Sequence, residues 1–184
     1  MVKLRTLFIT FWIFCLSKTI HAKFVFNFDL EDNFKQCEDG IPMPALNMST
    51  LKFSELDDSS MQVTGKVIFE DDYPPPIALR LYSLRKMRGA WVPGELSRSD
   101  FDVCMKLQIP TEPWYTFTKH FQQKRCPFRK GHEEILPDVP YQDLGLGLPA
   151  DFAGEWKIFL EIIVNRNGRK VKECLTIPTT ILEV

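Results

Sequence analysis

Apolar and polar residues alternate along several parts of this 184-residue chain, most clearly over residues 61–69. In an extended strand Val63, Val67 and Phe69 would share one face, and polar residues would occupy the other. Three prolines follow at 74–76, and proline can neither donate to a β-ladder nor continue one. The segment is therefore predicted to be a half-buried strand.

A hairpin is predicted near the end of the chain. Apolar residues alternate over 156–164, residues 165–168 read Asn-Arg-Asn-Gly, and 170–176 returns. Asn-Gly tolerates the positive φ angles of a tight hairpin turn. Phe159 and Ile163 interrupt the polar face of the outgoing strand, which is typical of an internal strand covered on both sides.

Other segments rich in β-formers extend this pattern. Further strands are predicted at 24–30, 46–53, 77–84, 101–107, 115–121 and 176–182. The thirteen prolines and the scarcity of helical periodicity argue against a helical bundle and indicate an all-β sandwich or barrel. Residues 135–154 contain three prolines together with many apolar side chains, and are predicted to form a long loop.

The first 22 residues have the pattern of a secretory signal peptide. Lys3 and Arg5 precede an apolar run at 7–16, which is too short to span a bilayer. We expect cleavage after Ala22, secretion to the extracellular space, and one domain over 23–184. A retained signal anchor is the alternative, and the short apolar run disfavours it.

Cysteine number predicts two disulfides. Cys15 leaves with the signal, so the mature chain keeps Cys37, Cys104, Cys126 and Cys174. An even set in an oxidising route favours disulfides, and the residues alone leave all three pairings open. The set has no CxxC spacing and no histidine close by, which disfavours a zinc site.

Charge and modification signals describe the expected surface. The net charge is −1, and no basic block is long enough to attract nucleic acid, so no nucleic-acid partner is expected. Asn47-Met48-Ser49 is a glycosylation sequon, which predicts that Asn47 lies at the surface of a secreted protein.

Catalytic motifs are not recognisable in the sequence. His120 and His132 have no Ser or Cys in a nucleophile setting. Glu133 and Glu134 would point to opposite faces of a strand, so they form no acid/base pair, and solvated charge is expected there. We expect no enzyme activity, no cofactor and no metal, with a secreted hydrolase as the disfavoured alternative.

The apolar side chains of the 135–154 loop need a destination. Leu144, Leu146, Leu148 and Phe152 would plug the core, line the mouth of a cavity, or rest on a membrane or partner. The same question applies to a set of aromatic residues that lie in or near the predicted strands: Trp91, Trp114, Phe117, Phe121, Phe128 and Trp156. Packing is the ordinary role for such residues.

Several short motifs occur in a characteristic order along the mature chain. The central one is Cys-Pro-Phe-Arg-Lys-Gly at 126–131. The others are segments 33–40, 89–91, 102–104, 109–113, 136–137, 148–149, 154–158 and 167–170, the last leading to Cys174. This set resembles the ML (lipid-recognition) superfamily and its ganglioside activator proteins. The signal peptide, the four mature cysteines and the central motif are most similar to the insect branch that includes the Che-B chemosensory proteins.

This resemblance implies an immunoglobulin-like β-sandwich or cup with an apolar cavity between two antiparallel sheets. It implies the pairing Cys37–Cys174 and Cys104–Cys126, and a place at the cavity rim for Leu144, Leu146, Leu148 and Phe152. Further cysteines that the activator carries near its central motif are absent here. Ganglioside specificity and docking on a glycosidase are therefore not carried over.

The resulting hypothesis is a secreted, non-enzymatic binder or carrier of a lipid or hydrophobic small molecule. The insect branch implies a pheromone-type cue in chemosensation, delivered to a receptor or a membrane surface. Cavity or rim residues are expected to be Trp91, Trp114, Phe117, Phe121, Phe128, Leu144, Leu146, Leu148, Phe152 and Trp156. The alternative is a receptor-accessory or structural protein with a filled core, in which the same sandwich binds only protein.

Overall fold

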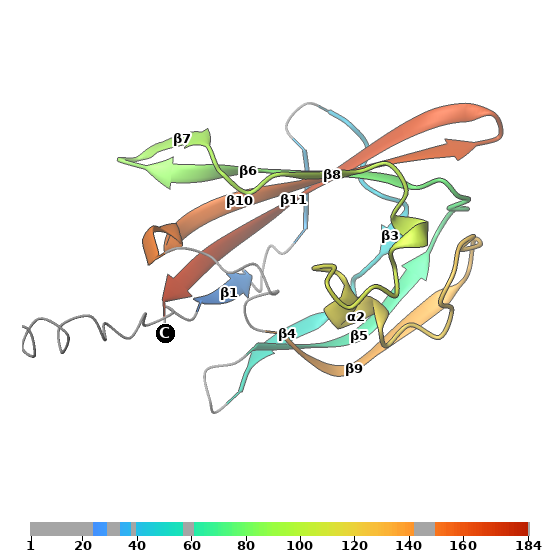
Figure 1. Cartoon of the computed structure of the whole chain (residues 1–184), viewed down its shortest axis with the longest axis horizontal. Helices are drawn as coiled ribbons and strands as arrows, with labels where there is room; N and C mark the ends of the chain where they lie inside the picture. Colours follow the sequence, from blue (N-terminus) through green and yellow to red (C-terminus); the bar gives the residue numbers. More distant parts are fainter. Residues whose placement is uncertain (1–23, 29–33, 38–39, 57–60, 142–149, 184) are drawn as a thin grey trace, which may run out of the picture.

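The computed structural model describes residues 24–28, 34–37, 40–56, 61–141 and 150–183. The predicted signal peptide and the rim candidates Leu144, Leu146 and Leu148 lie outside these residues. The described chain forms two antiparallel sheets that face each other as an all-β sandwich, as the alternation predicts (Figure 1).

In the described part of the chain the larger sheet has seven strands. Its main path runs β1 (Phe24–Phe28), β11 (Arg169–Glu183), β10 (Gly154–Arg166), β6 (Ala78–Met87) and β7 (Ala90–Pro93), with β2 (Lys35–Gln36) paired to β11 and β8 (Arg98–Asp100) paired to β6. The predicted terminal hairpin is β10–β11, and its turn places Asn167 and Gly168 at φ angles of 52° and 72°. Asn-Gly is suited to these angles.

The smaller sheet is built around the strand predicted at 61–69. This strand is β5 (Met61–Phe69), which pairs with β3 (Leu46–Asn47), β4 (Lys52–Glu55) and β9 (Glu133–Tyr141). Met61, Val63 and Phe69 of β5 are buried, so their shared face points to the interior. Residues 46–53 are thus two short strands and not one, because a turn in which Leu51 N–H donates to Met48 O interrupts the pairing. Both strands run antiparallel to β5 and continue in the same direction along it.

The strands predicted at 101–107 and 115–121 are wrong. Both segments lie within or next to the stretch between Cys104 and Cys126. Residues 101–107 contain a short 3-10 helix, η1 (Val103–Met105), whose N-cap Asp102 accepts from the Cys104 N–H. Residues 115–121 begin with the helical turn α2 (Tyr115–Thr118), in which Thr118 N–H donates to Trp114 O. Local hydrogen bonds therefore override the strand preference of these Thr- and aromatic-rich residues.

The prediction of a long loop at 135–154 is also wrong. Its first part belongs to β9, which runs through Pro137 and Pro140 and pairs with β5 alone among the strands that the structure describes. Proline is tolerated in an edge strand because every second N–H points away from the partner strand. The second part contains a 3-10 helix, η2 (Ala150–Phe152), and β10 begins at Gly154.

Strand β10 is covered on both faces, as Phe159 and Ile163 predict for an internal strand. Trp156, Ile158 and Ile162 are buried on the side facing the smaller sheet, whereas Phe159 is buried on the opposite side. There Phe159 stacks on Tyr82 with ring centroids 4.8 Å apart. The Cys37–Cys174 disulfide packs beside this pair.

The two disulfides are Cys37–Cys174 and Cys104–Cys126, the pairing that the resemblance implies. The first joins the chain after β2 to β11, and the second closes the segment that carries η1 and α2. Disulfides are compatible with an extracellular protein. None of the helices in the described part of the chain has the length and apolar character needed to cross a membrane.

Candidate functional site

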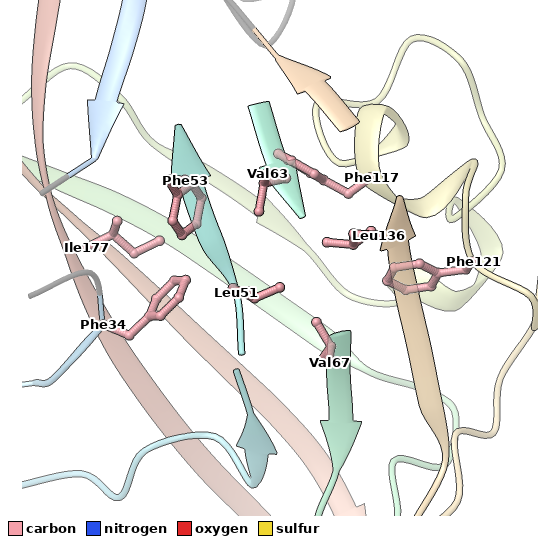
Figure 2. Close-up of a pocket in the computed structure, with 9 residues that line it drawn as sticks. All are labelled: Phe34, Leu51, Phe53, Val63, Val67, Phe117, Phe121, Leu136 and Ile177. Atoms are coloured by element: carbon pink, nitrogen blue, oxygen red, sulfur yellow. The ribbon is translucent and has the colours of Figure 1, made fainter. Parts of the chain in front are cut away.

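An apolar cavity of about 220 Å³ lies between the two sheets. Figure 2 shows the nine side chains around it, from both sheets and from the segment that follows η1. They are Phe34, Leu51, Phe53, Val63, Val67, Phe117, Phe121, Leu136 and Ile177. The cavity is therefore bounded by parts of the chain that are far apart in sequence.

The smaller sheet supplies the largest share of the wall. Val63 and Val67 come from β5, Leu136 from β9, and Phe53 from β4, with Leu51 just before it. These strands place their inward side chains on one face because successive residues of a strand alternate sides. Val67 is four residues beyond Val63 and therefore lies on the same inward face of β5. The pairing of β5 with β9 is irregular here, because Val63 pairs with Val139 and Gly65 with Leu136, which leaves an extra residue in β9.

Residues on the larger sheet and around α2 complete the wall. Ile177 projects from β11, and Phe34 lies just before β2. Phe117 lies in α2 and Phe121 lies one helical turn further along, so both can face the same way. Figure 2 places these two rings on the same side of the cavity as Leu136.

Hydrogen bonds fix the α2 region over the cavity. Thr118 Oγ1 donates to Leu107 O, and Gln108 Nε2 donates to Thr118 O over 2.8 Å. Trp114 Nε1 donates to Lys106 O over 3.1 Å. The Phe117 ring is therefore held in position by the chain between Cys104 and Cys126.

Glu134 corrects the prediction of solvated charge at 133–134. Glu133 does pair with Lys66 at the surface, but Glu134 points inward from β9 and is fully buried. Its carboxylate accepts from the Gln122 and Gln123 N–H groups, and Oε1 lies 2.7 Å from His132 Nε2. Glu134 thus connects β9 to the chain directly after Phe121.

The lining chemistry suits hydrocarbon. All nine side chains are aliphatic or aromatic hydrocarbons, so among the described residues the wall offers no acid, base, nucleophile or metal ligand. The volume of about 220 Å³ exceeds the roughly 150 Å³ of an apolar protein cavity that holds benzene. It is below the roughly 300–1,000 Å³ of pockets for drug-sized ligands. One slender chain of about nine carbons fits these limits, by scaling from benzene.

Two of the aromatic candidates, Phe117 and Phe121, lie in the cavity wall. Phe128 is instead buried against Phe69, stacked at 4.6 Å between ring centroids. Trp114 packs beside that same cluster with the Arg98 guanidinium over its ring. These last two residues occupy filled core outside the cavity wall.

The remaining candidates lie towards other parts of the larger sheet. Trp156 is buried on β10, stacks on Phe152 at 5.3 Å, and donates from Nε1 to Phe152 O. Trp91 is exposed on β7, with the Lys157 ammonium 4.9 Å from its ring centre. None of these three lines the cavity.

Several wall residues were not among the sequence candidates. Val63 and Val67 could have been found, because they fall on the inward face of the predicted strand. Leu136 was hidden by the assignment of 135–154 to a loop. Phe34 and Ile177 carry no distinctive sequence signal, since their position depends on how the sheets meet.

Charged side chains also form hydrogen bonds in the sandwich outside the cavity. At one end of the sandwich Glu173 accepts from Tyr73 Oη and Arg166 Nη1, each over 2.6 Å. Burial, and then Glu173, raise the pKa of the Tyr73 hydroxyl far above its usual range. Burial, followed by Lys119 and Lys124, lowers the pKa of His120. Among the described residues, no three His, Cys, Asp or Glu side chains are grouped to hold a metal ion.

The sequon lies on the outer side of the smaller sheet. Asn47 pairs with Ile68, whereas the neighbouring Leu46 pairs with the buried Phe69. Asn47 Oδ1 accepts from the Ser49 N–H and hydroxyl groups. A glycan on Asn47 would therefore extend away from the cavity.

No protein-family description and no curated protein matches this chain. Among solved structures, the chain is similar to the crystal structure of the C-terminal domain of wzt, with a TM-score of 0.37 and 10% sequence identity. The match covers 86% of this chain and 80% of that one. A likeness at this level carries no argument about function.

Proposed function

We propose that this protein is a secreted, non-enzymatic carrier that holds a hydrocarbon chain between its two sheets. The observation that carries the proposal is the cavity of about 220 Å³, whose described lining residues all have apolar side chains. A cavity of this kind disfavours the alternative of a filled core that binds only protein. The resemblance of the sequence to the ML superfamily supports the same function.

The size and chemistry of the cavity define the class of ligand. A slender chain of about nine carbons would enter the cavity, and a polar head group would stay outside because the wall offers it no partner. Within the resemblance to insect chemosensory proteins, such a ligand is a pheromone-type cue. A receptor or membrane surface would receive it.

Burial of the chain would set the affinity. Each buried methylene contributes about 0.8 kcal/mol, so nine of them contribute about 7 kcal/mol before the cost of immobilising the ligand. Because about 7 kcal/mol corresponds to a Kd of about 10 μM, that cost makes the expected affinity weaker than about 10 μM. Binding should be reversible, which suits a carrier.

Calorimetric titration with n-alkan-1-ols from hexanol to hexadecanol tests the proposal. The secreted protein, stripped by organic extraction, should bind best near nine carbons. Leu136→Trp should weaken binding about tenfold, since loss of two buried methylenes costs about 1.6 kcal/mol. Absence of binding by the wild-type protein would refute the proposal.

Ile135→Trp is the matched control. Ile135 precedes Leu136 on β9 but points outward and is half exposed. The same ring at this position leaves the cavity unchanged, so Ile135→Trp should bind like the wild type. Equal weakening by both variants would show that the ligand does not occupy this cavity.

A further inference from the structure

Glu134 occupies a position where a β-sandwich normally places an apolar residue. It shares the inward face of β9 with Leu136, Val139 and Tyr141, which are all buried. Leu136, the next inward residue, lines the cavity. A carboxylate with no exposed surface therefore lies directly beside the cavity wall.

The carboxylate has specific partners. A buried carboxylate is strongly unfavourable unless hydrogen bonds replace its water. Glu134 accepts from the backbone N–H groups of Gln122 and Gln123, the latter over 2.9 Å, and contacts His132. Because backbone donors have fixed directions, the carboxylate determines where this stretch of chain can lie.

That stretch begins immediately after Phe121. The Phe121 ring lines the cavity and also meets Phe128 edge to face, with ring centroids 6.2 Å apart. On its other side the segment is held through Thr118 and the Cys104–Cys126 disulfide. Glu134 connects this segment by hydrogen bonds to β9, the strand that forms the neighbouring part of the wall. The Phe117 ring also meets Tyr141 of β9, with ring centroids 6.1 Å apart.

We propose that Glu134 is a positioning residue that sets the depth of the cavity, and thereby the chain length of the ligand, by fixing Phe121 relative to β9. This role rests on the proposed carrier function. If residue 134 held the segment after Phe121 further from β9, Phe121 would move outward and the cavity would admit longer chains. If it held the segment closer to β9, Phe121 would move inward and the cavity would favour shorter chains.

Two substitutions separate these directions. Glu134→Gln replaces one acceptor oxygen with an NH2 group, which is a donor and cannot accept from the backbone N–H groups of Gln122 and Gln123. The segment should therefore move away from β9. Glu134→Asp keeps both oxygens and the charge on a side chain shorter by one methylene, so the segment should move towards β9. Glu134→Asp also carries the test if Glu134→Gln fails to fold.

Glu173→Gln provides the control for a general loss of stability. Glu173 is also a buried carboxylate with two hydrogen-bond partners, Tyr73 and Arg166, but none of these three residues lines the cavity. Its substitution should destabilise the fold without moving Phe121. The chain-length optimum should then equal that of the wild type.

The experiment measures affinity across n-alkan-1-ols from hexanol to hexadecanol for the full secreted protein and the three variants. We expect the optimum to lengthen by two or more carbons in Glu134→Gln and to shorten in Glu134→Asp. An unchanged chain-length optimum in the Glu134 variants, or an equal shift in Glu173→Gln, would overturn the role proposed for Glu134. Either result would leave the carrier function standing. If the wild type binds no alcohol, the carrier function and this role both fail.

Discussion

The same pair of sheets encloses a filled region and a hollow one. The filled region comprises Phe69, Tyr73, Phe128, Ile162 and Val164, and the hollow region is the cavity with its nine lining residues. Both are rich in phenylalanine, so aromatic content does not distinguish them. Their geometry does.

In the filled region the rings close the space between the sheets. Phe128 lies flat on Phe69 at 4.6 Å, and Tyr73 meets Phe69 edge to face at 5.6 Å. In the hollow region the Phe34 and Phe53 rings are tilted, with centroids 6.3 Å apart. Side chains there surround a volume without occupying it, which is a feature of placement and not of residue type.

The largest expected effect is the loss of stability on removing either disulfide, and the two disulfides should differ in its size. Removing Cys37–Cys174, with a sequence separation of 137, should lower the free energy of unfolding by about 5 kcal/mol. Removing Cys104–Cys126, with a separation of 22, should lower it by about 3 kcal/mol. Urea denaturation of the two Cys→Ser pairs measures both values.

Ligand binding should depend more strongly on the Cys104–Cys126 disulfide than on Cys37–Cys174. The Cys104–Cys126 pair closes the segment that carries Phe117 and Phe121, so its loss should weaken alcohol binding more strongly in protein that remains folded. Stronger weakening after loss of Cys37–Cys174 would contradict the assignment of this segment to the cavity wall.

Truncating one ring in each region should give unequal losses of stability. Phe128→Ala should cost about 3–5 kcal/mol, because it opens a new void in filled core. Phe117→Ala should cost about half as much, because that ring is only partly buried and already borders empty space. Equal losses in denaturant unfolding would mean that the two regions are packed alike.

Tyr73→Phe tests the charged end of the filled region and has the smallest expected effect. At pH 7 the loss of the hydrogen bond to Glu173 should cost about 2 kcal/mol. Burial and Glu173 raise the pKa of Tyr73, so above pH 10 the unfolded tyrosine loses a proton that the folded one keeps. The wild type therefore loses stability as pH rises through this range.

The difference between wild type and Tyr73→Phe should consequently shrink between pH 7 and pH 10.5. Urea denaturation at the two pH values measures it, and alcohol binding at pH 7 should be the same in both proteins. A difference that stays constant or grows with pH would contradict the placement of Tyr73 beside Glu173.

The sequence predicts the frame of the sandwich better than its cavity. Regular alternation identifies β5 and the β10–β11 hairpin, because each buries one face or lies inside a sheet. The same rule fails for α2, where the hydrogen bonds of Thr118 and Trp114 outweigh the strand preference of the residues. It fails for β9 because an edge strand accommodates Pro137 and Pro140.

The candidate site was only partly predictable for a related reason. Inward positions such as Val63 follow from alternation, but whether an inward side chain meets a partner depends on the separation of the sheets. Phe128 and Trp156 were expected to line a cavity, and they pack in filled core because Phe69 and Phe152 lie directly against them. Sequence pattern gives the direction of a side chain and not the distance to the next layer.

The central claim is that a hydrocarbon chain enters the hollow region and leaves the filled region unchanged. Methyl NMR spectra recorded while 1-nonanol is titrated into the protein test this claim most directly. We predict shifts at the methyl groups of Leu51, Val63, Val67, Leu136 and Ile177, and none at those of Ile162 and Val164. Unchanged cavity methyls, or equal shifts in both regions, would contradict it.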